Sequence, residues 1–211
     1  MPGSSAAHWL GTQLAHPAGW GGWIVGQAMR AVNREPIRLA LDALDVGPSD
    51  VALDLGCGPG AGVGLLTKEA AHVHGVDASE TMLATARRAN RAAIAAGRVT
   101  LAQGNFEAIP LARGSIDRIL AANVVYFWTD MRAVISEVRR VVRPGGRLVL
   151  YLTDASTMQH WPFADHRTHR HFDEISLQCA LAEAGVMPSH ISVSRHALSG
   201  GVAGLICAVE F

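Results

Sequence analysis

Short apolar runs alternate along most of this chain with longer segments whose apolar residues recur every three or four positions. The short runs predict β-strands at residues 51–55, 72–77, 99–102, 116–122 and 147–153. The longer segments predict helices at residues 65–71, 79–96, 130–142 and 173–184, the second of them capped by Ser79. Strands and helices that alternate in this way favour right-handed βαβ units, and so an α/β fold with a mostly parallel sheet covered on both faces.

The C-terminal end departs from this alternation. Residues 191–196 and 204–211 are both strand-like, and the short turn Leu198-Ser199-Gly200-Gly201 separates them. Two strands joined by a short glycine turn form a hairpin. The last strand is therefore expected to run antiparallel to its neighbour.

The N-terminal end is rich in aromatic residues and glycine. Residues 24–44 look helical, with an interruption near Glu35-Pro36, and we treat residues 1–46 as a helical cap segment. Trp9, Trp20 and Trp23 either close over a substrate pocket, where they would suit an apolar or lipid-like substrate, or pack an N-terminal helix onto the sheet. The remaining residues, 47–211, are expected to form a single globular unit.

Glycine occupies every second position from Gly56 to Gly64 in the stretch LDLGCGPGAGVG. Each glycine in a regular element costs roughly 0.5–1 kcal/mol relative to alanine, so this series indicates a turn that another group approaches closely. In an open α/β sheet, a turn that follows a strand lies at the carboxyl edge, where ligands bind. The alternative is a flexible linker, which does not suit the strand and helix that flank the stretch so tightly.

Two aspartates accompany this turn. Asp77 closes the second predicted strand, where a carboxylate can accept hydrogen bonds from ribose hydroxyls; alternatively it is a turn residue or part of the next helix cap. The turn itself fits the spacing Asp54-x-Gly56-x-Gly58-x-Gly60 better than a dinucleotide pattern. A carboxylate ahead of the glycines would repel a pyrophosphate and suits a ligand with a positive amino group.

Five stretches now point to one family. They are VALDLGCGPGAG, HVHGVDAS, GNFEAIPL, SIDRILAANVVYFW and VRRVVRPGGRLVLY, which follow one another between residues 51 and 151. Together they resemble the class I S-adenosylmethionine-dependent methyltransferases, particularly their small-molecule branch. The resemblance implies a Rossmann-like, seven-stranded, mostly parallel sheet with helices on both faces and an antiparallel C-terminal hairpin strand. It also implies S-adenosyl-L-methionine as the cofactor.

The resemblance further implies which residues hold the cofactor. They are Asp54, Gly56, Gly58 and Gly60 at the methionine part, Asp77 at the ribose, Ala78 and Met82 beside the adenine, Asn105 and Phe106 next to them, and Asn123 near the methyl group. Many relatives carry aspartate where this chain has Asn105. The carbonyl oxygen of an amide can still accept a hydrogen bond from the adenine amino group.

Methyl transfer from a sulfonium is a direct displacement, so the protein chiefly aligns the two reactants. Such positioning can be worth about 7–11 kcal/mol, which makes a dedicated base optional. In relatives the end of the fourth strand borders the methyl group, so Asn123 and Tyr126 are candidate catalytic residues. Their spacing resembles the Asn-Pro-Pro-Tyr motif of amino-group methyltransferases without its prolines. Alternatively Tyr126, Phe127 and Trp128 pack against the neighbouring helix.

Histidines gather at residues 160–171, between the fifth strand and the next helix. One interpretation is a general base poised near neutral pH, with His166 as the candidate. A second is a metal site, but the spacing matches no structural zinc pattern and no metal is predicted. A third is a polar lid or a surface loop.

Composition narrows the partner class. Lysine plus arginine number 18 and aspartate plus glutamate number 18, so no global charge favours nucleic acid or an acidic membrane, and a small-molecule methyl acceptor is expected. No stretch approaches the roughly 18 apolar residues of a transmembrane segment, and the N-terminus does not read as a signal peptide, so a cytoplasmic protein is expected. Cys57, Cys179 and Cys207 form neither a CxxC pair nor an even disulfide set and are expected to be reduced.

The favoured function is S-adenosylmethionine-dependent methyl transfer to a nitrogen or oxygen nucleophile of a small molecule. One competing hypothesis is a nicotinamide-dependent oxidoreductase, which the glycine spacing and the terminal hairpin disfavour. Another is a non-catalytic module that binds S-adenosylmethionine.

Overall fold

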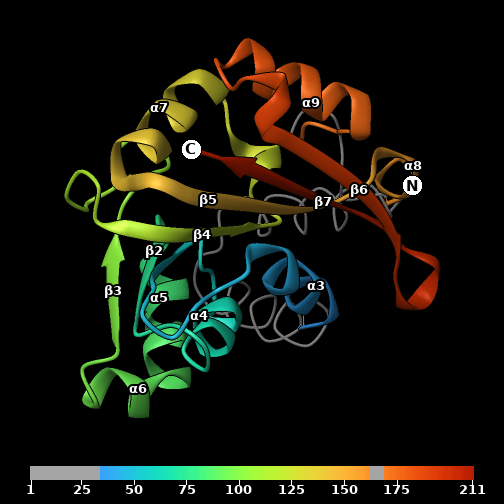
Figure 1. The fold of residues 1–211 in the computed structure, drawn as a ribbon. Coiled ribbons are helices and arrows are strands. Elements are labelled where there is room, and N and C mark those ends of the chain that lie inside the picture. Colours follow the sequence, from blue (N-terminus) through green and yellow to red (C-terminus); the bar gives the residue numbers. More distant parts are fainter. Residues whose placement is uncertain (1–33, 162–168) are drawn as a thin grey trace.

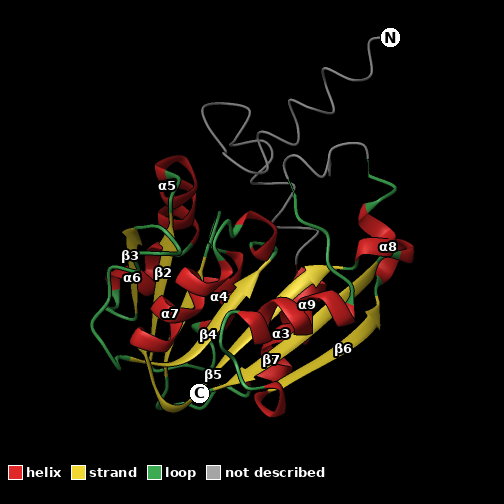
Figure 2. Cartoon of the chain, turned by 90° about the horizontal axis from the view of Figure 1, so that it is seen from above, coloured by secondary structure: helices red, strands yellow, loops and turns green. Residues whose placement is uncertain are grey.

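One sheet of seven strands forms the centre of the molecule. The structure is a computed structural model that describes residues 34–161 and 169–211. Its strands are β1 (Val51–Leu55), β2 (His72–Asp77), β3 (Val99–Gln103), β4 (Ile116–Ala122), β5 (Val142–Thr153), β6 (Ile191–Ala197) and β7 (Ala203–Glu210). Their order across the sheet is β3-β2-β1-β4-β5-β7-β6, with β3 and β6 at opposite edges (Figures 1 and 2).

Helices cover both faces of this sheet. On one face lie α3 (Arg34–Leu44), α4 (Ala61–Leu66), α5 (Glu80–Ala89) and α6 (Arg91–Ala95), and on the other α7 (Met131–Val141) and α9 (Glu174–Glu183) (Figure 1). The short helices are α8 (Ala155–Met158), η1 (Val125–Phe127), η2 (Pro188–His190) and η3 (Ser199–Gly201). Two apolar clusters result, one between the sheet and α7 and α9, the other between the sheet and α3 and α4.

The strand directions confirm the predicted topology. β1 pairs in parallel with β2 and β4, β2 with β3, and β4 with β5, whereas β7 runs antiparallel to both β5 and β6. The strand order therefore reverses at β1: the chain adds β2 and β3 on one side of β1 and then crosses to add β4 on the other side. In an open α/β sheet, the crevice outside the carboxyl ends of the strands at such a switch point is where ligands bind.

The predicted helix at residues 65–71 was wrong. The observed helix α4 begins at Ala61 and ends at Leu66, because the left-handed Gly60 lets the chain enter the helix directly from the glycine turn. Beyond it, the guanidinium of Arg98 donates to the carbonyls of Thr67 (2.6 Å) and Ala70 (2.7 Å). These bonds hold the following residues in turns instead of a continued helix.

The predicted helix at residues 79–96 is in fact two helices. Ser79 caps α5 as expected, and its hydroxyl accepts a hydrogen bond from the Met82 N–H (3.4 Å). Asn90 separates α5 from α6. Its side-chain amide donates to the carbonyls of Ala86 (3.0 Å) and Gly60 (3.1 Å), so it competes with the helix backbone and ties α5 to the glycine turn.

The predicted strand at residues 147–153 begins earlier, at Val142, directly after α7. The register between β4 and β5 shifts between Ile116 and Arg118, and Gly145 adopts a left-handed φ of 79°. The N–H of Gly145 donates to the carbonyl of Phe211 (2.7 Å). Residues 143–146 are thus an irregular part of the strand.

Helix α3 is the part of the predicted N-terminal cap segment that the structure describes. Its apolar residues Ile37, Ala40, Leu41 and Leu44 are buried on the sheet. Pro36 lies in the first turn of α3, where its missing N–H would have no partner within the helix. The expected interruption is therefore the start of α3. Residues 1–33, with Trp9, Trp20 and Trp23, lie outside the described residues, and the boundary at residue 46 stays a prediction.

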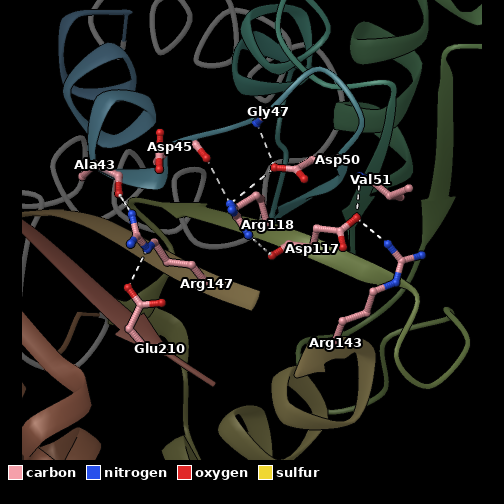
Figure 3. A network of polar contacts seen from close by, with 10 residues as sticks. All are labelled: Ala43, Asp45, Gly47, Asp50, Val51, Asp117, Arg118, Arg143, Arg147 and Glu210. Carbon is pink, nitrogen blue, oxygen red and sulfur yellow. Dashed lines mark hydrogen bonds and ion pairs between the residues drawn. The ribbon is translucent and has the colours of Figure 1, made fainter. Parts of the chain in front are cut away.

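A polar network joins the amino-terminal ends of β1, β4 and β5 (Figure 3). The Asp117 carboxylate accepts from the Val51 N–H (2.8 Å) and pairs with Arg143, while Arg118 pairs with Asp50 (3.4 Å). Arg147 pairs with Glu210 of β7 (2.6 Å) and donates to the carbonyl of Ala43 (2.9 Å). These contacts fix the edge of the sheet that lies away from the glycine turn.

Candidate functional site

The glycine turn is the connection between β1 and α4. Gly56, Gly58 and Gly60 all have left-handed backbone, with φ of 76°, 50° and 81°. The N–H groups of Gly56 and Cys57 both donate to the carbonyl of Val76 in β2 (2.8 and 3.0 Å). The turn is therefore fixed to the end of the neighbouring strand and is not a flexible linker.

The glycines of this turn differ in what surrounds them. A Cβ on Gly56 would lie 2.5 Å from Val124 Cγ1, one on Gly60 would lie 2.6 Å from the Asn90 side chain, and one on Gly62 would lie 2.5 Å from the Asp54 carboxylate. A Cβ on Gly58 would meet no atom of residues 34–161 or 169–211 within 4 Å. Packing within the protein accounts for three of these glycines, whereas no contact within the described part of the chain accounts for Gly58.

Asp77 lies beside Gly58 at the end of β2. Its carboxylate oxygens accept from the N–H groups of Gly58 and Ser79, both at 2.8 Å. Burial raises the pKa of Asp77 above its usual value, although these two N–H groups oppose the shift. Asp77 thus has the turn role that was the alternative interpretation. Each carboxylate oxygen has a second lone pair, so the predicted ribose contact remains possible chemically and stays a prediction.

Asp54 lies below the turn and is only 3% exposed. The Val63 N–H in the first turn of α4 lies near its carboxylate and acts to lower its pKa. Burial raises the pKa of Asp54 to about 7, and the nearby charge of Asp77 adds to this effect. Its carboxyl group therefore supports the start of α4 from beneath, and its predicted pairing with a ligand amino group stays a prediction.

The residues predicted beside the adenine lie on the loops that follow β2 and β3 and, for Met82, in the first turn of α5. Ala78 is exposed and its carbonyl accepts from the Gln103 side chain (2.9 Å), while the Met82 side chain is buried. Asn105 is exposed, and its carbonyl accepts from the Ala108 N–H (3.2 Å). Phe106 is half-buried, and its ring lies 3.1 Å from the position of a Cβ on Gly56. The structure thus brings Phe106 to the glycine turn.

Asn123 and Tyr126 lie on the segment that follows β4. Asn123 has a left-handed φ of 58°, which asparagine tolerates better than most residues. The Tyr126 hydroxyl donates to the Asn123 side-chain oxygen (3.0 Å) and accepts from the Thr153 N–H. Tyr126 is 6% exposed, and burial raises its pKa well above the usual range, so its hydroxyl is neutral at working pH.

The histidine run is described only in part. Residues 162–168 lie outside the described residues, and the candidate base His166 is among them. His169 is buried, with its ring centre 5.0 Å from that of Phe127 and 5.9 Å from that of Tyr126. Burial lowers the pKa of His169, and His171 adds to the shift. The end of this run therefore packs against the segment after β4.

Several known proteins are similar to this chain in sequence. A family described as "Methyltransferase domain" matches residues 53–150. An uncharacterized 37.1 kDa protein in transposon TN4556 of Streptomyces fradiae is 42% identical over 113 residues, which are 52% of this chain and 32% of that protein. An uncharacterized methyltransferase of Bacillus subtilis is 30% identical over 129 residues, which are 60% of this chain and 69% of that protein. This chain belongs to the class I S-adenosylmethionine-dependent methyltransferases.

A solved structure supports the fold of this methyltransferase. It is a complex between the Haloferax volcanii Trm112 methyltransferase activator and a putative methyltransferase, and the matched chain has a TM-score of 0.74 at 17% identity. The match covers 95% of this chain and 96% of that chain. Because the chain belongs to this methyltransferase family, the hypothesis of a nicotinamide-dependent oxidoreductase is rejected.

The residues of the methyltransferase fit its cofactor. Among the described residues nothing fills the space beside the Gly58 backbone, and the Asp77 carboxylate next to it has lone pairs that suit ribose hydroxyls. Among residues 34–161 and 169–211, no group of three or more metal-ligating side chains could hold a metal ion. Within those same ranges, no helix is long and apolar enough to cross a membrane.

Two contacts of the site escaped the sequence analysis. Asn90 reaches the carbonyl of Gly60 from α5, and asparagine inside an otherwise helical pattern was the available signal. The Thr153 N–H at the end of β5 bonds to Tyr126, for which the sequence offers no local signal because the two residues are 27 positions apart. The three cysteines are free thiols, with Cys57 and Cys207 buried and Cys179 exposed.

Proposed function

We propose that this methyltransferase transfers a methyl group from S-adenosylmethionine to a nitrogen or oxygen nucleophile of a small molecule by direct displacement. The observation that carries the proposal is Gly58. Its N–H donates to the Asp77 carboxylate (2.8 Å), and among the described residues no atom lies within 4 Å of where its Cβ would be. This arrangement lies at the switch point of the sheet, where ligands bind in open α/β folds.

The roles of the residues follow from chemistry. The bound cofactor would supply a methyl group on a positively charged sulfur. Gly58 would let the methionine part approach the backbone, Asp77 would accept from the ribose hydroxyls, and Asp54 would add negative charge beneath the amino group. Phe106, half-buried beside Gly56, would cover the adenine side together with the loop after β2.

A small-molecule acceptor is supported by charge and by the segment after β4. The chain has equal numbers of acidic and basic residues, which gives no global attraction to nucleic acid. Asn123 follows β4 at the same edge as the glycine turn, and Val124 touches that turn. Alignment of two bound reactants can supply about 7–11 kcal/mol, so the reaction does not require a base, although His166 remains the candidate for one.

The test has two steps. Isothermal titration with S-adenosylmethionine and with S-adenosylhomocysteine measures cofactor binding, and both are expected to bind. A panel of amines, phenols and carboxylic acids is then incubated with methyl-labelled cofactor, and products are identified by mass. Binding with no labelled product from any acceptor would support a non-catalytic module. If neither compound binds at millimolar concentration, the proposed function is wrong.

A further inference from the structure

The ladder between β4 and β5 ends in an unusual way. The Asn123 N–H donates to the carbonyl of Tyr151 (2.8 Å), in register with the pairing of Ala122 and Tyr151. In a regular parallel ladder, the next bond would run from the Thr153 N–H to the carbonyl of Asn123. Asn123 has left the strand conformation, with φ of 58°, and this bond is replaced.

The replacement is the Tyr126 hydroxyl. The Thr153 N–H donates to its oxygen, and the hydroxyl in turn donates to the Asn123 side-chain oxygen (3.0 Å). Thr153 is 4% exposed and Tyr126 is 6% exposed, so solvent water does not reach these groups to replace either hydrogen bond. A buried N–H that loses its partner is costly, which makes this hydroxyl part of the ladder.

The same segment is held from its other side. The Arg170 N–H donates to the carbonyl of Tyr126 (3.3 Å), and the Arg170 guanidinium donates to the carbonyl of Trp128 (3.2 Å). Val124, between Asn123 and Tyr126, fills the space beside Gly56. The position of the segment at residues 123–128 therefore determines what borders the glycine turn.

We propose that Tyr126 is a positioning residue whose hydroxyl takes the place of the Asn123 carbonyl in the β4–β5 ladder and so fixes residues 123–128 against the glycine turn. Its effect on methyl transfer rests on the proposed function. Both hydrogen-bonding directions of the hydroxyl are used within the protein, so it orients the segment and does not act on the substrate.

The experiment compares Tyr126→Phe with Tyr151→Phe. Tyr151 is the other tyrosine of the chain and is also buried, but the Thr153 N–H donates to the Tyr126 hydroxyl and not to that of Tyr151. Amide exchange at Thr153 is measured by NMR in the protein without ligand, and kcat, KM and the Kd for S-adenosylhomocysteine are measured alongside. We expect Tyr126→Phe to speed exchange at Thr153 about tenfold or more, because it removes the acceptor, and Tyr151→Phe to leave it unchanged.

In the Tyr126→Phe variant, kcat is expected to fall about tenfold while the Kd for S-adenosylhomocysteine changes less than about threefold, because alignment is lost and binding is not. Unchanged exchange at Thr153 would overturn the proposal. A loss of kcat with unchanged exchange would mean that the hydroxyl acts in catalysis, which also overturns it. A rise in exchange with full kcat would show that the segment does not need fixing, with the same consequence.

A second variant serves if Tyr126→Phe does not fold. Asn123→Gly keeps the left-handed backbone accessible and removes the side-chain oxygen that orients the Tyr126 hydroxyl. Exchange at Thr153 is expected to rise about threefold in this variant, and no rise would overturn the proposal. Exchange is measured without cofactor or substrate, so it tests the role of Tyr126 in the β4–β5 ladder even if the wild-type protein is inactive. An inactive wild-type protein would contradict only the proposed function.

Discussion

Acidic residues at the two opposite edges of this sheet, where the strands begin and end, have different partners. At the amino-terminal edge, Asp117 and Glu210 pair with arginines (Figure 3). At the carboxyl edge, Asp77 accepts hydrogen bonds from two backbone N–H groups, and among the residues that the structure describes no ion pair joins Asp54 or Asp77 to a basic side chain. Asp117 and Glu210 are thus paired with arginines within the protein, whereas Asp54 and Asp77, next to the glycine turn, are not.

The pKa values reflect this difference. Burial raises the pKa of Asp117, but the Val51 N–H and the nearby arginines more than offset it, so the pKa lies below its usual value. Burial raises the pKa of Asp54 to about 7 and also raises that of Asp77. Buried carboxylates with raised pKa values beside a cleft are typical of functional sites, which supports the proposed cofactor position at the carboxyl edge.

Removing the carboxylate charge at each edge gives the largest contrast. Asp77→Asn is expected to weaken S-adenosylhomocysteine binding about 10- to 100-fold, because hydrogen bonds to a charged group are worth roughly 1.5–3 kcal/mol. Asp117→Asn is the matched control at the other edge and is expected to leave the Kd unchanged. Titration calorimetry measures both. An equal loss of S-adenosylhomocysteine affinity in the two variants would contradict the assignment of the cofactor to the carboxyl edge.

Glycines with the same backbone and free space occur at both edges. Gly58 and Gly145 have left-handed φ of 50° and 79°, and a Cβ on either would meet no atom within 4 Å in the part of the chain that the structure describes. Gly58→Ala and Gly145→Ala are each expected to lower the free energy of unfolding by about 1–2 kcal/mol through backbone strain. Only Gly58→Ala is expected to weaken cofactor binding, as measured by calorimetry. Unimpaired binding in Gly58→Ala would mean that the open space is not used.

The pH dependence of stability should have opposite signs at the two edges. An unfolded aspartate ionises near 3.8 and folded Asp54 near 7, so between these values the folded state holds a proton that the unfolded state has lost. The contribution of Asp54 to the free energy of unfolding therefore falls as pH rises through this range, by about 1.4 kcal/mol per pH unit. Asp117, with its lowered pKa, contributes stability that is lost as pH falls below about 4.

Urea unfolding of the ligand-free protein and of Asp54→Asn, from about pH 5 to about pH 7, measures this slope. The advantage of the aspartate over the asparagine should shrink steadily across the range. A difference that stays constant with pH would show that Asp54 is ionised throughout.

The smallest effect is expected from the ion pair between Arg147 and Glu210. Both side chains are partly exposed, and surface pairs contribute less than about 1 kcal/mol. Glu210→Gln should shift the thermal midpoint slightly and leave cofactor binding unchanged in the same calorimetric assay. A loss of binding in this variant would show that the two edges are coupled.

Much of the fold could be predicted because the apolar pattern is strong where strands are buried on both faces. Residues 116–122 were predicted as a strand and form β4 with the same bounds. The helix after the glycine turn was misplaced because the glycines at its start hide the helical pattern. The contact of Gly62 with the Asp54 carboxylate and the bond from Asn90 to the Gly60 carbonyl join separate elements, so the local sequence does not reveal them.

For the site, the spacing correctly suggested that the glycine turn and Asp77 meet, as the bond from the Gly58 N–H shows. The burial of Asp54 beneath α4 and the contact of Tyr126 with Thr153 could not be predicted. Both depend on how separate elements pack and leave no mark in the local sequence.

Hydrogen exchange with and without S-adenosylhomocysteine, read by mass spectrometry across the chain, tests the central claim most directly. The ligand is expected to slow exchange at residues 56–60 and 77–79 and to leave residues 117–118 and 143–147 unchanged. Protection at the amino-terminal edge, or saturating ligand with no change at residues 56–60, would contradict the assignment of the cofactor to the carboxyl edge.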